Sequence, residues 1–273
     1  MTTRMAEAEA ARGPDVSGRA PVLPPALVAF LDALGDMATL TRDAVRYALT
    51  RPPGWRVIVE QLEHIGWRSL SIVNLTALST GMVLALQLGH SLDRFGAKPF
   101  VSRIVGVSLV REMGPILTAL MIGGRVGAGI TAEIGTMAVT EQVDAIRALG
   151  ASPVRALVVP RMLALLVMLP ALTVIGDLVG ILGGLVISVT EMHVGASFYV
   201  NSLLQGLMLN DVLSGIGKSF FFAYFIGIIA CRNGLRVTGG ADGVGRATTS
   251  TVVAASITVL VSDFFLTKLF LVS

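Results

Sequence analysis

Residues 111–161 decide the fold of this chain, and they read REMGPILTALMIGGRVGAGITAEIGTMAVTEQVDAIRALGASPVRALVVPR. Acidic and basic residues recur there between apolar runs that are typical of helices in lipid. A charge inside a bilayer costs free energy, so a charge in a spanning helix usually has a function. The stretch also contains one short amphipathic segment. It therefore separates two hydrophobic halves of a membrane protein at a place where we expect a soluble partner to dock.

The composition is that of an integral membrane protein. The chain is 53% hydrophobic and 14% charged, with a mean hydropathy of +0.77. Its apolar runs are continuous rather than alternating, which favours helices over a closed β-barrel. Basic residues flank these runs and form no dense tract, so we expect no nucleic-acid partner. One cysteine, Cys231, and three histidines far apart in sequence predict no metal site.

Five apolar segments approach or exceed the roughly 20 residues that a helix needs to cross a bilayer. The predicted spans are residues 69–92, 100–122, 157–189, 213–231 and 251–271. Pro160 and Pro170 are expected to bend or interrupt the third span. Gly176, Gly180 and Gly184 in the same span have a spacing that lets two helix backbones approach closely.

The segment before the first span divides into two parts. Residues 1–25 lack an apolar run, which predicts a disordered cytoplasmic tail rather than a signal peptide. In residues 26–66, apolar positions recur at helical spacing and charged residues occupy the other faces, which predicts an amphipathic helix region at the membrane interface. A soluble helical hairpin is the alternative, because Pro52 and Pro53 would suit a linker. Residues 67–273 form the predicted transmembrane domain.

An odd number of spans places the two termini on opposite sides of the membrane. Arginines gather in the N-terminal region, between the second and third spans, and between the fourth and fifth spans. Basic residues mark cytoplasmic segments, so we expect a cytoplasmic N-terminus and a periplasmic C-terminus.

Charged residues inside three of the spans are the first candidate site. Arg111 and Glu112 lie about midway along the second span, Lys218 opens the fourth, and Asp263 lies in the fifth. Intramembrane charges usually pair with one another or line a wet cavity, so these residues could meet inside a helix bundle. The alternative is that each reaches a nearby interface, which suits Lys218 better than Glu112.

A short helix between the second and third spans is the second candidate site. Thr140 is its expected N-cap, and Gly150 and Pro153 are expected to end it. The residues that it would present to a partner are Glu141, Gln142, Val143, Asp144, Ile146, Arg147 and Leu149. Such a helix can be a lever moved by a motor subunit, or it can rest on the lipid headgroups. The chain has no phosphate-binding loop, so any ATP dependence requires another subunit.

Several ordered motifs resemble the MlaE permeases, also called YrbE, of bacterial ABC transporters that act on lipids with MCE-domain proteins. The motifs are REMGPILTALMIGGRVGAGITAEIGTM, TEQVDAI, LGASPVR, GRATTSTVV and SDFFLT, and the likeness extends from about residue 26 onward. It implies an all-α homodimeric permease in the inner membrane, with an interfacial helix and five spans in each copy. The implied partners are an MlaF-like ABC ATPase, which binds ATP with Mg, a hexamer of MlaD-like MCE proteins, and an MlaB-like STAS protein. The permease itself catalyses no reaction.

The resemblance also implies roles for particular residues. Arg111 and Glu112 match a charged pair near a lipid cavity between the two permease copies, and Lys218 and Asp263 match intramembrane charges of later helices. Residues 141–149 resemble the coupling helix that enters the ATPase. Arg246, in GRATT, resembles a basic position at the cytoplasmic end of the last helix. Phospholipid is the implied substrate, and an ion-coupled secondary transporter that uses the intramembrane charges is the alternative.

Overall fold

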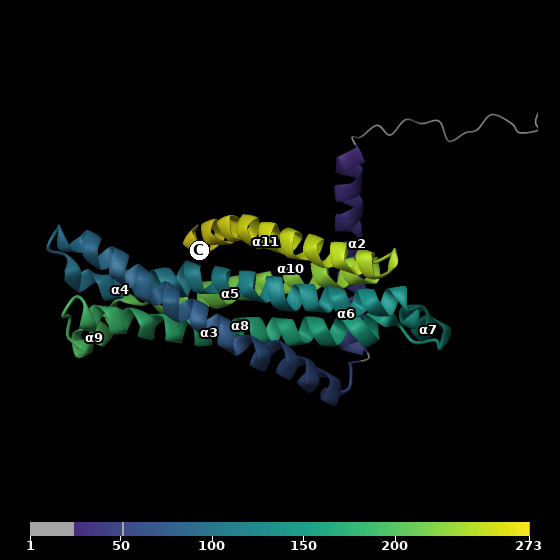
Figure 1. The fold of residues 1–273 in the computed structure, drawn as a ribbon, viewed down its shortest axis with the longest axis horizontal. Helices are drawn as coiled ribbons and strands as arrows, with labels where there is room; N and C mark the ends of the chain where they lie inside the picture. The colour runs from purple at the N-terminus through teal and green to yellow at the C-terminus, as the bar shows by residue number, and fades with distance from the viewer. Residues whose placement is uncertain (1–24, 51, 273) are drawn as a thin grey trace, which may run out of the picture. The chain divides into compact units, whose positions relative to one another are not determined.

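The computed structural model describes residues 25–50 and 52–272, and these form helices and short connections without a strand (Figure 1). In chain order the elements are α2 (Pro25–Thr50), α3 (Trp55–Asp93), η1 (Lys98–Phe100), α4 (Val101–Ser108), η2 (Leu109–Met113), α5 (Gly114–Ile122), η3 (Gly123–Gly127), α6 (Ala128–Val139), α7 (Gln142–Ala148), η4 (Val154–Val158), α8 (Val159–Thr190), α9 (Ala196–Gly206), α10 (Leu209–Leu235) and α11 (Gly240–Val272). The predicted tail lies outside the described residues, apart from Pro25, which begins α2.

Five helical stretches are long and apolar enough to cross a membrane, which confirms the predicted all-α, five-span architecture. They are Trp55–Asp93, Lys98–Val139, Val154–Thr190, Leu209–Leu235 and Gly240–Phe270. Each is longer than predicted, because the helix continues beyond the apolar run into segments with charged residues. Residues 55–66, which we assigned to the interfacial region, belong to the first of these helices. A helix satisfies its own backbone hydrogen bonds, so it can continue from lipid into the interface without a break.

The chain divides into two compact units within α2, at Thr39 and Leu40. The described part of the first unit is the N-terminal portion of α2, which exposes Leu31 and Leu34. The second unit contains the five spans. In this unit α10 packs against α6, α8 and α11, which makes it the central helix. A side chain on α10 is therefore more often enclosed by protein than by lipid.

Glycines bring α3 and α8 together, and Figure 1 shows α3 crossing α8. A Cβ at Gly81 would overlap the carbonyl oxygen of Gly180, and a Cβ at Gly183 would lie 2.5 Å from the carbonyl oxygen of Leu78. Close contact between spanning helices requires such small residues. The structure confirms the close approach predicted from the glycine spacing in the third span.

Wide π-helical turns interrupt two of the spans. In the second span η2 directly precedes Gly114 and Pro115, and η3 contains Gly123 and Gly124. Proline lacks a backbone N–H, and glycine costs helix stability, so the regular hydrogen-bond pattern is weakest there. In the third span η4 precedes Pro160, whereas α8 continues through Pro170. Short π-helical segments inside α-helices frequently mark functional sites.

The connection between the third and fourth spans contains a helix that the sequence did not indicate. This helix, α9, packs against α4 and buries Tyr199, whose hydroxyl donates a hydrogen bond to the carbonyl oxygen of Ile181 at 3.3 Å. Burial raises the pKa of Tyr199 to about 12. Tyr199 thereby attaches this connection to the third span.

Candidate functional site

A charge cluster inside the helix bundle is the principal candidate site. The Lys218 side chain is fully buried on α10. Its ammonium group forms an ion pair and a hydrogen bond with Glu112 Oε2, and it lies 3.1 Å from Asp263 Oδ1. The three residues come from the second, fourth and fifth spans. The structure thus brings together three of the predicted intramembrane charges, and protein encloses the Lys218 side chain completely.

Thr267 completes the cluster from the next turn of α11 after Asp263. Lys218 Nζ donates a hydrogen bond to Thr267 Oγ1 at 2.7 Å. The Thr267 hydroxyl in turn lies 3.2 and 3.3 Å from the two carboxylate oxygens of Glu112 and can donate to them. Sequence analysis missed Thr267, although it lies one helical turn after Asp263, where side chains share a face.

The position of Glu112 depends on the π turn η2, which contains it. A π turn inserts one residue relative to the regular helix, and side chains after it are rotated about the helix axis. Gly215, on α10, packs so closely here that a Cβ would overlap the carbonyl oxygen of Val110. The backbone of α10 therefore approaches η2 closely, which brings Lys218 to Glu112.

Arg111 does not join this cluster. Its guanidinium group lies 3.6 Å from Asp211 Oδ1, at the start of α10, and both side chains are partly exposed. Asp211 also accepts a hydrogen bond from the backbone N–H of Met208 at 3.0 Å, and so it caps the helix. Sequence analysis missed Asp211, which its position in the first turn of a helix could have indicated. The two adjacent charges, Arg111 and Glu112, thus belong to different contacts.

An ion pair between a buried arginine and an exposed glutamate links the second and third spans. Arg161 is 7% exposed; it donates hydrogen bonds to Glu133 Oε2 at 2.9 Å and to the carbonyl oxygen of Leu157 at 2.8 Å. Sequence analysis assigned neither residue a role, although the basic residue directly follows an apolar run. Asp177, which lies buried in α8, was also missed, although it is an isolated acidic residue in an apolar span.

The predicted coupling segment forms the short helix α7. Its N-cap residue is Glu141, in the left-handed region with a φ of 61°, whereas the Thr140 hydroxyl donates to the carbonyl oxygen of Thr136 at 2.7 Å. The prediction that Thr140 caps this helix was therefore wrong, because Thr140 instead continues the hydrogen bonding of α6. Gly150, with a φ of 73°, follows the helix as predicted.

Some residues of α7 anchor the helix to the bundle, and others are exposed. Val143 is buried, Ile146 is half-buried, and Leu149 is 85% exposed. These three apolar residues thus pack against the protein at the N-terminal end of α7 and are exposed at its C-terminal end. Glu141, Gln142, Asp144 and Arg147 are exposed, and Arg147 pairs with Asp144 at 2.7 Å. A soluble partner could contact these residues without disturbing the bundle.

The other expected site residues are placed as follows. Arg246 is exposed in the second turn of α11, at the end of the helix opposite to Asp263 and Thr267. Within residues 25–50 and 52–272, no three His, Cys, Asp or Glu residues form a group that could hold a metal ion. Cys231, the free thiol, is buried in α10.

Comparison with known proteins identifies the family. The model of the family described as Permease MlaE matches residues 58–269. A probable ABC transporter permease protein of Rickettsia felis is 42% identical over 244 residues, which are 89% of this chain and 94% of the relative. Another, from Synechocystis, is 42% identical over 214 residues, which are 78% of this chain and 81% of that relative.

A plant protein is also similar. Protein trigalactosyldiacylglycerol 1, chloroplastic, of Arabidopsis thaliana is 34% identical over 216 residues, which are 79% of this chain and 62% of the plant protein. The family match covers all five spans apart from their outermost residues, and it includes every residue of the charge cluster. This multi-pass membrane protein therefore belongs to the MlaE family of ABC transporter permeases.

Proposed function

We propose that this chain is the permease subunit of an ABC transporter that moves phospholipid, or a related hydrophobic molecule, between the bacterial inner membrane and a periplasmic MCE-protein carrier. Such transport would maintain the lipid asymmetry of the outer membrane. The observation that carries the proposal is the cluster of Glu112, Lys218 and Asp263 inside an apolar bundle. The name of the Arabidopsis relative contains that of a diacylglycerol glycolipid, which supports a lipid substrate.

The charge cluster suits a helix bundle that must be stable in two conformations. It contains two carboxylates and one ammonium group, so it has an excess negative charge when all three are ionised. Its members come from three spans, and a relative movement of these spans would change the partners of Lys218. A buried charge has few stable alternatives, so the bundle would move between discrete states rather than deform gradually. ATP-driven changes could thereby close and open a lipid cavity.

The exposed face of α11 supports a homodimer as the functional unit. Large apolar side chains lie along this helix and are more than half exposed; they are Val253, Ile257, Leu260, Val261, Phe264 and Phe265. The last two directly follow Asp263, so one helix presents an apolar face outward and a charge inward. In the proposed dimer, this face borders a cavity between the two copies, where lipid chains would contact apolar side chains.

Conformational changes of the ATPase would be transmitted to the permease through α7. An MlaF-like ATPase would bind ATP and Mg and would contact Leu149 together with the polar residues around it. In the proposed orientation α7 and the N-terminus are cytoplasmic, and the C-terminus is periplasmic, where a hexamer of MlaD-like proteins would receive lipid. An MlaB-like STAS protein would attend the ATPase. Membership of an ABC permease family favours this ATP-driven scheme over the ion-coupled alternative.

Reconstituted transport tests the proposal. The tagged chain is purified in mild detergent with its native partners, which are identified by mass spectrometry, and the complex is placed in vesicles that contain a fluorescent phospholipid. We expect ATP-dependent transfer to the soluble MCE-domain carrier. Glu112→Ala should reduce transfer to the level without ATP and leave the complex assembled. Glu60→Ala, which removes an exposed glutamate of α3, is the matched control and should transport normally.

Two results would contradict the proposal. Recovery of the chain without an ABC ATPase, under conditions that preserve other membrane complexes, would favour the ion-coupled alternative. If an assembled Glu112→Ala complex transported lipid at the wild-type rate, the charge cluster would have no role in transport.

A further inference from the structure

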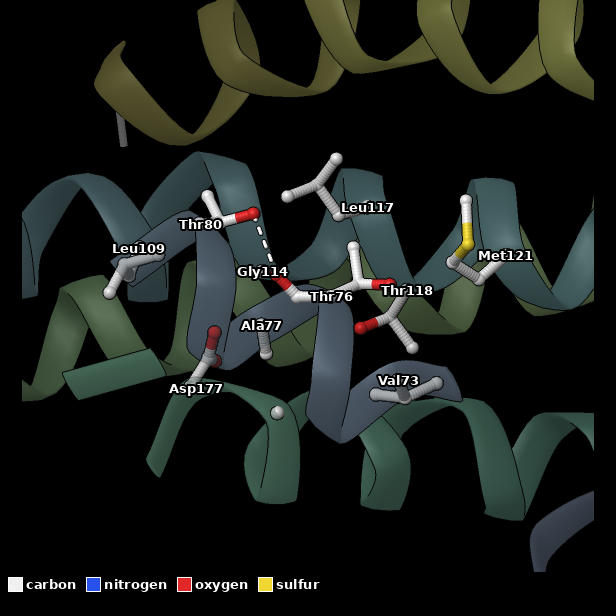
Figure 2. Close-up of a pocket in the computed structure, with 11 residues that line it drawn as sticks. Val73, Thr76, Ala77, Thr80, Leu109, Gly114, Leu117, Thr118, Met121 and Asp177 are labelled. Carbon is white, nitrogen blue, oxygen red and sulfur yellow. Dashed lines mark hydrogen bonds between the residues drawn. The ribbon is translucent and has the colours of Figure 1, made fainter. Parts of the chain in front are cut away.

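A small cavity, lined by apolar and a few polar side chains, lies between α3, the second span and α8, apart from the charge cluster (Figure 2). Its volume is about 10 Å³. This volume accommodates roughly one water-sized particle. The polar side chains on its wall are those of Thr76, Thr80, Thr118 and Asp177.

Asp177 is the only acidic residue on the wall of this cavity, and it is 8% exposed. Its Oδ1 atom is buried and has no hydrogen-bond partner, and none of the ion pairs within the described ranges, 25–50 and 52–272, includes it. A Cβ at Gly114 would overlap this oxygen, so the glycine allows the carboxyl group to approach the second span. A buried ionised carboxylate without a partner is strongly destabilising.

The threonines around Asp177 present oxygen atoms rather than hydrogens. Thr76 donates its hydroxyl hydrogen to the carbonyl oxygen of Ile72 at 2.7 Å, and Thr80 donates to that of Thr76 at 2.8 Å. Figure 2 shows the second of these bonds as a dashed line. Each hydroxyl oxygen retains lone pairs that can accept a hydrogen bond or bind a cation. Thr118 adds a third hydroxyl from α5.

The wall of the cavity therefore suits a positively charged occupant of about the size of water. A proton on Asp177 would neutralise the carboxyl group but would not use the lone pairs of the three threonine hydroxyls. A water molecule would satisfy the oxygens but would not neutralise the carboxylate. A divalent cation usually binds several carboxylates or keeps several waters, for which this cavity has neither the groups nor the space.

We propose that this cavity binds one sodium ion, held by Asp177 and by hydroxyl oxygens of Thr76, Thr80 and Thr118. The ion would neutralise the buried carboxylate and link the first, second and third spans. Its role would be structural, and it does not depend on the lipid-transport proposal, because none of these residues belongs to the charge cluster.

Equilibrium binding of ²²Na⁺ to the purified chain with its native partners tests the site. We expect saturable binding to the wild type. Asp177→Asn keeps the shape of the side chain and removes its charge, so affinity should fall by more than about tenfold. Asp242→Asn, at an exposed position in the first turn of α11, is the matched control and should bind sodium as the wild type does.

Thr118→Val keeps the charge and removes one hydroxyl oxygen, so it tests the site if the Asp177 variant does not fold. Its affinity should fall by about two- to tenfold, as expected for the loss of one neutral oxygen contact. The absence of saturable sodium binding by the folded wild type would overturn the proposal and would indicate water or a proton in the cavity. Undiminished binding by folded Asp177→Asn would also overturn it, because the ion would then lie elsewhere.

Discussion

Replacement of Lys218 by methionine should destabilise this protein more than most single substitutions. The ammonium group lies between Glu112 and Asp263, and its side chain is 0% exposed. Methionine has a similar apolar stem and fills the same space, so the substitution removes a charge without making a large cavity. The remaining carboxylates would then lie near one another inside the bundle, and the Thr267 hydroxyl could still donate to Glu112.

The magnitude follows from the burial of the contacts. Loss of one partner from a buried ion pair typically costs about 3–5 kcal/mol, because the other charge stays buried without compensation. We expect Lys218→Met near the upper end of this range, since two carboxylates lose the same cation. The Glu112 and Asp263 side chains are 27% and 15% exposed, so water screens them only in part.

A neutral version of the cluster provides the control. The triple variant Glu112→Gln, Lys218→Met, Asp263→Asn retains the approximate shapes of the side chains and leaves no charge in the cluster. Because neutral replacements of buried ion pairs are often tolerated or stabilising, we expect its stability to lie within about 1–2 kcal/mol of the wild type. Its lipid transport should nevertheless be lost, because the charges would no longer change partners.

The single thiol provides the assay. Cys231 is buried in α10, the helix that contains Lys218, so a maleimide should label it only after the bundle opens. Labelling is measured against increasing SDS in mixed micelles, and the midpoints yield the differences in stability. A loss of less than about 1 kcal/mol for Lys218→Met would refute the reasoning. So would a triple variant that is no more stable than the single one.

Two further predictions concern packing and partner binding. Gly81→Ala should destabilise the chain by about 1–3 kcal/mol, because its Cβ would overlap the carbonyl oxygen of Gly180. The matched substitution Gly124→Ala, which has no atom within 4 Å of the added Cβ, should be nearly neutral in the same labelling assay; equal losses would contradict this account of α3 and α8. Val143→Asp should lower stability because Val143 is buried, whereas Leu149→Asp should leave stability unchanged and reduce copurification of the ATPase. Retention of a stoichiometric ATPase by the Leu149 variant would argue against α7 as the docking helix.

Much of the fold followed from the pattern of apolar residues. Each span is a long and mostly apolar run, and such a run has few alternatives to a helix in a bilayer. The ends of the helices were less well predicted, because the helices at Trp55 and Val139 extend into amphipathic sequence that hydropathy does not distinguish from a surface helix. The predicted N-cap at Thr140 was wrong for a related reason. A threonine hydroxyl can either cap the next helix or donate to a carbonyl oxygen of the preceding one, and Thr140 does the second.

The charge cluster was predicted only in part. The sequence indicated that Glu112, Lys218 and Asp263 were costly in lipid and needed partners, but it could not pair them. Arg111 and Glu112 are adjacent in sequence, yet one contacts Asp211 and the other Lys218. Neighbouring residues on a helix point in different directions, so adjacency in sequence does not imply a shared site.

The sequence by itself determined that this chain is a helical membrane protein with five spans and an exposed short helix, because solvation in lipid depends mainly on the composition and length of each segment. The tertiary structure alone decided which charges meet, and it placed Asp177 without a partner beside threonine oxygens. Those contacts depend on the rotation and closeness of helices that are far apart in sequence. Glycine packing sets how closely two helices approach, and π turns set how a helix is rotated. A hydropathy profile contains information about neither quantity.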